Sequence, residues 1–244
     1  MESIISIQNL SKVYGQQKVL DIPELNFYKG QSLGLVGNNG AGKTTLFRAI
    51  LDLIAPATGT VHIKGIPVSN SESWKTFTGS FIDESFLIDY LTPQEYFDFL
   101  GKLHGLNKED VKEALLPFEP LFQGEILNNK KYIRDLSKGN QKKVGIAGAL
   151  LCKPEILILD EPFANLDPSS QFLLRQMLSD LDKNTDITMI LSSHDLLHIT
   201  EFCERFLVLH KGLIVKDELR KEETLAELQA YFQSQILPQE EQSK

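Results

Sequence analysis

One run of residues in this chain has the types and spacing of a phosphate-binding loop. Residues 37–44 read Gly-Asn-Asn-Gly-Ala-Gly-Lys-Thr, which fits the pattern Gly-x-x-x-x-Gly-Lys-Thr. Glycines let backbone N–H groups approach phosphate oxygens closely, and the lysine can reach the β- and γ-phosphates of a nucleotide. The Thr44 hydroxyl is suited to bind Mg²⁺. We therefore predict nucleotide binding by Gly37, Asn38, Asn39, Gly40, Ala41, Gly42, Lys43, Thr44 and Thr45.

Two carboxylates follow an apolar segment in the second half of the chain. Residues 156–159 read Ile-Leu-Ile-Leu, which predicts a strand buried on both faces, and Asp160 and Glu161 come directly after it. Ligands of open α/β folds bind at the carboxyl ends of the strands, where this pair would lie. We predict that Asp160 binds Mg²⁺ together with Thr44, and that Glu161 is the general base that activates water.

A histidine follows a second apolar segment. Residues 187–191 predict another buried strand, and Ser192-Ser193-His194-Asp195 comes after it. At a strand end, His194 can contact a γ-phosphate or hold the attacking water. A lone histidine is as often structural or simply exposed, so its position alone leaves both interpretations open.

An alternation of strands and helices surrounds these residues. Residues 32–36 predict a strand before the loop and residues 45–53 a helix after it, so that phosphate would lie at a helix N-terminus. Apolar residues recur at helical spacing from Thr92-Pro93 onward, whereas residues 117–132 have little periodicity and predict a loop. Other predicted strands are 4–7, 19–20, 25–27, 60–63, 206–209 and 213–215, and other predicted helices are 108–116, 142–152, 168–181, 196–203 and 222–232.

This pattern divides the chain into parts. Residues from about 74 to 137 predict a helical insert between two halves of an α/β core. We expect one domain over residues 1–220 that contains this insert, followed by a C-terminal helix and a frayed tail over residues 221–244.

Composition narrows the class of protein. The 244 residues carry a formal net charge of −8, and 42% of them are hydrophobic, as in an ordinary globular domain. No segment approaches the roughly 20 apolar residues of a membrane span, and residues 1–6 lack a signal-peptide pattern. Nucleic-acid binding is not expected of an acidic chain, and Lys138–Lys143 predicts a solvated helix face. Cys152 and Cys203 indicate buried thiols in a reducing compartment.

Three further segments make the set of motifs specific. Leu136-Ser137-Lys138-Gly139-Asn140 precedes a predicted helix, Ala164-Asn165-Leu166-Asp167 follows the carboxylate pair, and Tyr14 lies among the early strands, where alone it would indicate packing. In this order, with the phosphate loop, they resemble the ATPase subunit of ATP-binding cassette (ABC) transporters over residues 4–216. The resemblance implies an α/β fold class: a P-loop NTPase core of mixed sheet flanked by helices, an N-terminal antiparallel β-subdomain, and a helical subdomain inserted between the phosphate loop and the signature motif.

The resemblance also implies roles for these residues. Two copies would face each other head to tail with ATP between them, and one copy would present its signature motif, Ser137, Lys138, Gly139 and Asn140, to the ATP of the other. Asp167, in the D-loop, would cross the interface. Tyr14 would stack on adenine, and His194 would be the switch histidine at the γ-phosphate.

Two positions depart from the family's pattern. The signature reads Leu-Ser-Lys-Gly-Asn in place of Leu-Ser-Gly-Gly-Gln, but it keeps the serine and the second glycine. An acid stands at the glutamine position of the Q-loop: this is Asp83 when counted back from Leu91-Thr92-Pro93, with Glu84 as the alternative. Asp83 is predicted to meet Mg²⁺ or water. Both variants resemble those of exporter-type subunits.

The resemblance implies an ATPase that binds ATP and Mg²⁺ and powers export through separately encoded integral membrane subunits. It implies a second copy as partner, in a homodimer at the cytoplasmic face of the membrane. A second hypothesis is an ABC ATPase of a soluble assembly machine, for example in iron–sulfur cluster assembly. A nucleotide-gated regulator with little turnover is disfavoured because Glu161 and His194 are both present. A small-molecule kinase would have no use for the signature motif.

Overall fold

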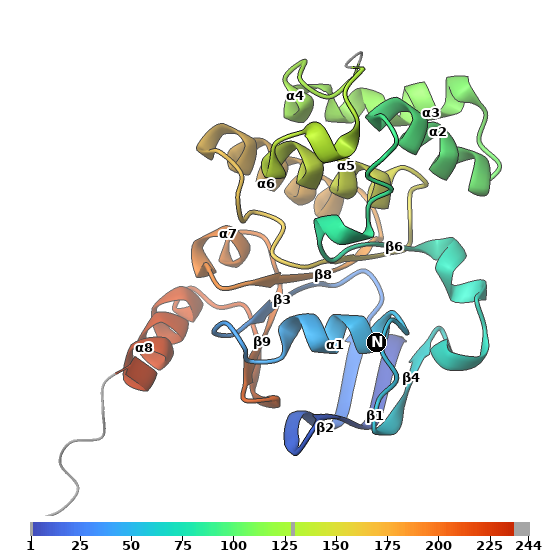
Figure 1. Cartoon of the computed structure of the whole chain (residues 1–244). Coiled ribbons are helices and arrows are strands. Elements are labelled where there is room, and N and C mark those ends of the chain that lie inside the picture. The colour runs from blue at the N-terminus through green and yellow to red at the C-terminus, as the bar shows by residue number, and fades with distance from the viewer. Residues whose placement is uncertain (1, 128–129, 237–244) are drawn as a thin grey trace, which may run out of the picture.

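A six-stranded sheet in the order β10-β9-β3-β8-β7-β6 crosses the middle of the computed structural model, which describes residues 2–127 and 130–236 (Figure 1). Strands β9, β3, β8, β7 and β6 run parallel, and β10 pairs antiparallel with β9. The strands span Ser32–Val36 (β3), Thr78–Phe81 (β6), Ile156–Leu159 (β7), Thr188–Ser193 (β8), Arg205–His210 (β9) and Leu213–Leu219 (β10). The predicted mixed sheet is therefore confirmed.

A second sheet is antiparallel, with the order β2-β1-β4-β5. Its strands span Ser3–Tyr14 (β1), Gln17–Tyr28 (β2), Thr58–Ile63 (β4) and Ile66–Pro67 (β5). Strands β1 and β2 pair along most of their length and are joined by a tight turn at Gly15 and Gln16. This is the antiparallel N-terminal subdomain that the family resemblance implies, although β1 and β2 are longer than the strands predicted over residues 4–7, 19–20 and 25–27.

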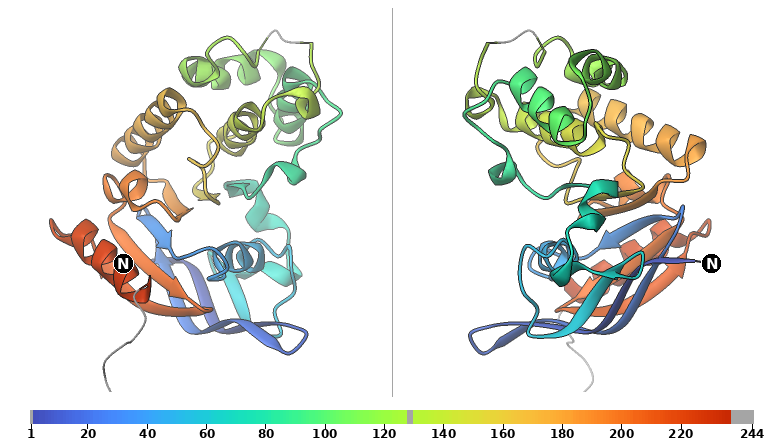
Figure 2. Two further views of the ribbon diagram at one scale, coloured as in Figure 1. Left: turned by 60° about the vertical axis from the view of Figure 1, so that its left-hand side comes forward. Right: turned by 90° about the vertical axis from the view of Figure 1, so that its right-hand side faces the viewer.

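Helices cover both faces of the six-stranded sheet. Figure 1 and the two views of Figure 2 place α2 to α6 on one side of it, and α1 on the other side with the antiparallel sheet. The helices span Lys43–Ile50 (α1), Pro93–Leu103 (α2), Lys108–Leu115 (α3), Glu119–Phe122 (α4), Lys138–Leu150 (α5), Pro168–Asn184 (α6), Leu196–Thr200 (α7) and Thr224–Ile236 (α8). Short 3-10 helices span Val68–Asn70, Ser73–Phe77, Glu84–Phe86, Leu116–Phe118 and Ile133–Asp135.

Strand β7 shows how the sequence builds two cores. All four of its residues are buried, because successive side chains point to opposite faces and both faces are covered. Ile156 and Ile158 pack with α1 and the antiparallel sheet, whereas Leu157 and Leu159 pack with the helices of the opposite layer. The continuous apolar run is thus the consequence of a strand covered on both sides, and Asp160 follows at its carboxyl end.

The structure differs from the sequence prediction in the stretch from 74 to 137. Strand β6 lies inside that stretch and joins the six-stranded sheet beside β7, and α4 lies where a loop was predicted. Thr78-Gly79-Ser80-Phe81 has no apolar run, so its strand conformation depends on pairing with β7 and on the cover provided by α5. The prediction for residues 237–244 lies outside the described residues.

Strand β6 and helix α5 approach each other unusually closely through two glycines. A Cβ atom at Gly79 would lie 2.0 Å from the Ala149 carbonyl oxygen, and one at Gly145 would lie 2.1 Å from the Phe81 ring. Both distances are far inside van der Waals contact. The short strand is therefore held against the helix by backbone and ring contacts that leave no room for a methyl group.

We expect Gly79→Ala to lower the free energy of unfolding by about 2–3 kcal/mol, because the added methyl group overpacks a contact with backbone that cannot rotate away. Chemical denaturation measures the effect as a lower midpoint at an unchanged slope. Ser80→Ala is the matched control, since Ser80 is the exposed neighbour on the same strand. Equal stability of the two variants would contradict the close packing described here.

The predicted solvated face of the basic run 138–143 is wrong for two of its lysines. Lys142 and Lys143 are only 5% and 3% exposed. They lie on α5, whose inner side packs against the rest of the protein, and acidic groups face both of them.

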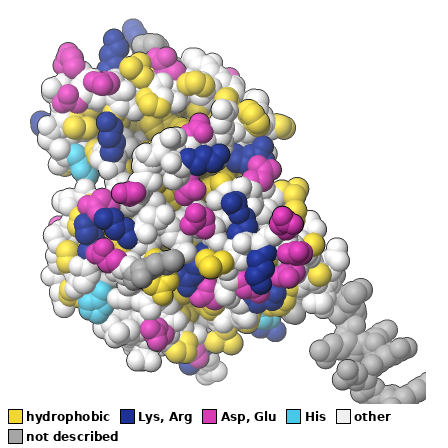
Figure 3. All heavy atoms as spheres, turned by 180° about the vertical axis from the view of Figure 1, so that it is seen from behind, with side chains coloured by type: hydrophobic (Ala, Val, Ile, Leu, Met, Phe, Trp, Pro, Cys, Tyr) yellow, Lys and Arg dark blue, Asp and Glu magenta, His cyan; other side chains and the backbone are white. Residues whose placement is uncertain are grey.

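On the face of the molecule shown in Figure 3, Lys and Arg side chains are interspersed with Asp and Glu.

Among residues 2–127 and 130–236, no helix is both long enough and apolar enough to cross a membrane.

Candidate functional site

The phosphate-loop sequence connects β3 to α1 and has the conformation that such a loop needs. Gly40 and Gly42 have φ angles of +80° and +112°, in the left-handed region that favours glycine. A Cβ atom at Gly37 would lie 2.5 Å from the Leu209 carbonyl oxygen of β9. No side chain caps the N-terminus of α1, so its first N–H groups remain available for an anion.

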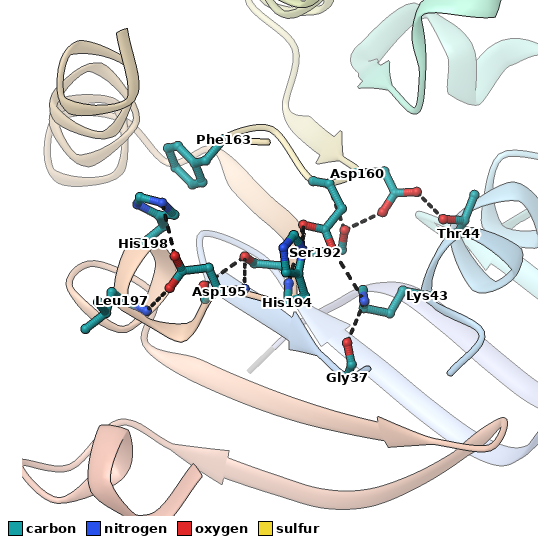
Figure 4. Close-up of polar contacts among 12 residues, drawn as sticks. Gly37, Lys43, Thr44, Asp160, Phe163, Ser192, His194, Asp195, Leu197 and His198 are labelled. Atoms are coloured by element: carbon teal, nitrogen blue, oxygen red, sulfur yellow. Dashed lines mark hydrogen bonds and ion pairs between the residues drawn. The ribbon is translucent and has the colours of Figure 1, made fainter. Parts of the chain in front are cut away.

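Lys43 points back over this loop. Its ammonium group, on a residue only 6% exposed, donates to the Gly37 carbonyl oxygen at 2.6 Å and lies 3.3 Å from Glu161 Oε1 (Figure 4). A buried cation needs such partners to offset the loss of hydration. Lys43 therefore lies between the loop and the carboxylate pair, where it can meet the phosphates of a nucleotide.

Two oxygen groups suited to a magnesium ion lie side by side. Thr44 Oγ1 donates to Asp160 Oδ2, and Ser192 Oγ donates to Asp160 Oδ1 (Figure 4). Burial raises the pKa of Asp160, and the hydrogen bonds from Ser192 and Thr44 act against that shift. Hydroxyl and carboxylate oxygens are the ligands that Mg²⁺ prefers. These two residues fit a site completed by phosphate oxygens and water.

Ser192 is a site residue that the sequence reasoning missed. It is the last residue but one of β8, and its hydroxyl contacts both carboxylate residues: it donates to Asp160 and accepts the Glu161 N–H at 2.9 Å. The signal was its place in Ser192-Ser193-His194, directly after an apolar strand. The sequence prediction for that segment names only His194.

Glu161 lies at the centre of the arrangement. His194 Nδ1 lies 2.8 Å from its Oε2, and the His194 N–H donates to the same oxygen at 3.3 Å. The other oxygen, Oε1, is buried and makes no hydrogen bond among the described residues, although Lys43 is near it. One side of the carboxylate is thus oriented by the histidine, and the other is available to accept a proton from water.

The signature residues lie apart from this cluster. Ser137 begins α5, and its hydroxyl accepts the Asn140 N–H at 3.2 Å. Asn140 donates to Glu125 at 2.8 Å, Lys138 to Gln141 at 3.1 Å, and a Cβ atom at Gly139 would lie 3.0 Å from the Asn165 carbonyl oxygen. Within the described part of the chain, no hydrogen bond or ion pair links them to residues 37–45.

Asp167 has a structural role of its own. Its carboxylate begins α6 by accepting hydrogen bonds from Ser169 Oγ, Ser170 Oγ and the Ser170 N–H. These bonds, with that of Ser169 first, hold the pKa of Asp167 below its usual range. The contact across an interface between copies remains a prediction.

Two other predicted positions lie outside the cluster. Tyr14 is half exposed at the end of β1, with the Lys12 ammonium 5.1 Å from its ring centre. Asp83 accepts hydrogen bonds from Arg48, at 3.1 Å, and from Ser85. Partial burial would raise the pKa of Asp83, but the bonds from Ser85 and Arg48 outweigh it and lower the pKa. Binding of adenine by Tyr14 and of Mg²⁺ by Asp83 remain predictions.

An apolar cavity of about 910 Å³ lies at the opposite edge of the sheet. Its lining includes Glu155 and Ile187, directly before β7 and β8, together with Leu121, Leu150 and Met177 from the helices. The loop and the carboxylates follow the carboxyl ends of the strands, so the cavity is remote from them. The chemistry of the residues identifies the candidate site, and cavity size does not.

Comparison with known proteins bears on this arrangement. Residues 20–164 match the family described as ABC transporter. An uncharacterized ABC transporter ATP-binding protein, YhaQ of Bacillus subtilis, is 37% identical over 219 residues, which cover 89% of this chain and 72% of that protein. The bacitracin transport ATP-binding protein BcrA of Enterococcus faecalis is 36% identical over 219 residues, covering 89% and 70%. The methionine import ATP-binding protein MetN of Carboxydothermus hydrogenoformans is 31% identical over 222 residues, covering 88% and 66%.

Solved structures share the fold. The ATP-binding subunit of an ABC transporter, 26% identical, superposes with a TM-score of 0.79 over 96% of this chain and 95% of that one. A dimeric ATP-binding cassette with bound ADP and phosphate, 24% identical, also gives a TM-score of 0.79 over 89% of this chain and 99% of that one. The family match over residues 20–164 and the relative that is 37% identical show that the chain belongs to the ABC transporter family and is an ATP-binding, ATP-hydrolysing subunit.

Proposed function

We propose that this subunit binds Mg²⁺-ATP between two copies of itself and uses hydrolysis to power export through separately encoded membrane subunits. The observation that carries the proposal is the division of the site residues. Lys43, Thr44, Asp160 and Glu161 lie together, whereas the signature residues are held on a different element. One chain therefore holds two complementary halves of a site, which a head-to-tail pair would bring together.

In this proposal, each residue in the half of the site formed by the phosphate loop, Asp160 and Glu161 has one task. The loop N–H groups and Lys43 bind the phosphates. Thr44 and Asp160 would hold Mg²⁺, which would supply positive charge to neutralise the phosphate oxygens. Glu161 accepts a proton from water while the water oxygen bonds to the γ-phosphorus. The bond from that phosphorus to the bridging oxygen breaks, which yields ADP and phosphate. His194 keeps Glu161 in the orientation required for this step.

The other half of the site, formed by the signature residues, couples ATP binding to the joining and release of the two copies. The N-terminus of α5, with Ser137 and Gly139, is an exposed helix start that can contact a γ-phosphate held by another copy. ATP would then join the two copies, and loss of the γ-phosphate would release them. This is a two-state device whose equilibrium is set by the ligand.

Export is supported by the residues at the variable positions. Asp83 and Lys138-Gly139-Asn140 resemble the residues of exporter-type subunits at the same positions. In the native cell, we expect the tagged chain to lie at the cytoplasmic face of the membrane. It should purify from the membrane fraction together with an integral membrane protein. Purification with soluble proteins alone would favour an assembly machine. In reconstituted vesicles, ATP-dependent movement of cargo toward the side that carries the ATPase subunit would contradict export.

An exposed aromatic pair is a candidate surface for that membrane partner. Phe86 and Tyr90 are 50% and 63% exposed in the segment between β6 and α2, near Asp83. Replacement of both by serine is expected to weaken the complex with the membrane subunits by about 30-fold, the usual effect of removing buried aromatic anchors. ATP binding by the isolated chain should not change.

Pull-down of the membrane subunits over a range of concentrations measures this effect. Phe172→Ser is the matched control, because Phe172 is 56% exposed on α6, away from this segment. Equal weakening by the control, or none by the pair, would contradict the assignment of the surface.

A further inference from the structure

The backbone of Glu161 has an unusual conformation. Its φ angle is +46°, in the left-handed region that residues with a side chain rarely adopt. Such strained positions persist only where the surroundings hold them, and they concentrate at functional sites.

Side chains from two other elements hold both backbone polar groups of Glu161. Its N–H donates to Ser192 Oγ on β8 at 2.9 Å, and its carbonyl oxygen accepts a hydrogen bond from Lys142 Nζ on α5 at 2.7 Å. The left-handed turn is therefore clamped from the sheet on one side and from a helix on the other. Lys142 is the charged member of this clamp.

Lys142 is unusual because its charged side chain is buried. It is 5% exposed, whereas lysines are rarely buried without a partner. Burial lowers the pKa of its ammonium group, and the negative charges of Glu84, Glu161 and Asp160 act in the opposite direction. These acidic groups surround the Lys142 side chain, and its hydrogen bond goes to the backbone of Glu161.

The same helix carries the signature motif. Ser137 is the N-cap of α5, Gly139 lies in its first turn, and Lys142 lies one turn further along. A rigid helix thus connects the residues proposed to meet the ATP of a second copy with the backbone of the proposed base in the same chain. The Lys142 side chain thus joins the signature helix directly to the backbone of the proposed base.

We propose that Lys142 is a positioning residue for ATP hydrolysis, which sets the orientation of Glu161 and ties it to the signature helix. The inference rests on the proposed function, because it requires Glu161 to be the base. Lys142 does not touch the nucleotide in this account, so it acts on the rate of hydrolysis and not on the affinity for ATP.

The test compares Lys142→Met with the wild-type chain, since methionine keeps much of the length of lysine but has no donor for the Glu161 carbonyl. We expect kcat to fall about 10- to 100-fold, the range for a slightly misplaced catalytic group, with KM for ATP within about twofold of the wild-type value. Lys142→Arg, which restores a cationic donor, should recover part of the loss. If the methionine variant does not fold, the arginine variant takes its place as the test, with a smaller expected fall in kcat.

A double variant separates positioning from a purely structural role. In the Glu161→Gln background, single-turnover hydrolysis should be nearly the same with Lys142 or Met at position 142, because the residue acts through the base that is already gone. Lys143→Met removes the other buried lysine of α5, and its effect should be the same in both backgrounds. Equal losses from Lys142→Met in both backgrounds, an unchanged kcat, or a rise in KM would overturn the inference. Near wild-type turnover by Glu161→Gln alone would instead refute the proposed function.

Discussion

Glu161→Gln is expected to lower the turnover of ATP by about 10³-fold and to leave ATP binding intact, because an amide cannot accept the proton of the attacking water. The amide keeps the size of the carboxylate and can still contact His194, which lies 2.8 Å from Oε2. The phosphate loop and Lys43 do not change. The loss should therefore appear in kcat and not in the affinity for nucleotide.

The same variant should accumulate as a dimer when ATP is added, since the step that releases the two copies is blocked. Steady-state phosphate release measures turnover, and light scattering with and without ATP measures the dimer. Glu155→Gln is the matched control: Glu155 precedes the same strand at the far edge of the sheet, in a surface ion pair with Lys64. Turnover of the Glu161 variant near the level of this control would show that another residue is the base.

Gly139→Asp is expected to reduce turnover by about 100-fold or more, because a carboxylate at the start of α5 would face the γ-phosphate of the second copy. Binding of ATP to the isolated chain should remain, since no described contact joins Gly139 to residues 37–45. ATP should no longer produce a dimer. The variant thus separates nucleotide binding from assembly.

The control for this variant is Gly139→Ala. Both substitutions add a Cβ atom 3.0 Å from the Asn165 carbonyl oxygen, so both carry the same local crowding. Only the aspartate adds charge. Equal turnover and equal melting temperatures for the two variants would mean that packing against Asn165, and not repulsion of phosphate, explains the loss.

Much of the fold follows from patterns that depend on neighbouring residues. The strand Ile156–Leu159, buried on both faces, could be read directly from four consecutive apolar residues. The motif from Gly37 to Thr44 and the acids after β7 carry their chemistry in their sequence, and the structure places them together. The helix from Pro93 begins with a capping box, in which Thr92 and Glu95 bond each other's backbone.

Features that depend on distant partners could not be read in the same way. Strand β6 contains Gly79 and Ser80 and becomes a strand through pairing with β7 and contact with α5. The burial of Lys142 follows from how α5 packs on the carboxylate turn, which the basic composition of its segment conceals. The sequence around Ser192 does not mark it as a site residue, because its role depends on the hydrogen bonds that it makes with Asp160 and Glu161.

The central claim is that each site is built from two chains, and mixing two inactive variants tests it most directly. A head-to-tail pair of one Glu161→Gln chain and one Gly139→Asp chain would contain one doubly damaged site and one intact site, with Glu161 from one chain and Gly139 from the other. Random pairing would make about half of the dimers mixed, and each mixed dimer has one intact site of two, so an equimolar mixture should regain turnover far above either separate variant, up to about a quarter of the wild-type value. Turnover that stays at the level of the separate variants, while a tag on one variant captures the other and so shows that mixed dimers form, would contradict the account.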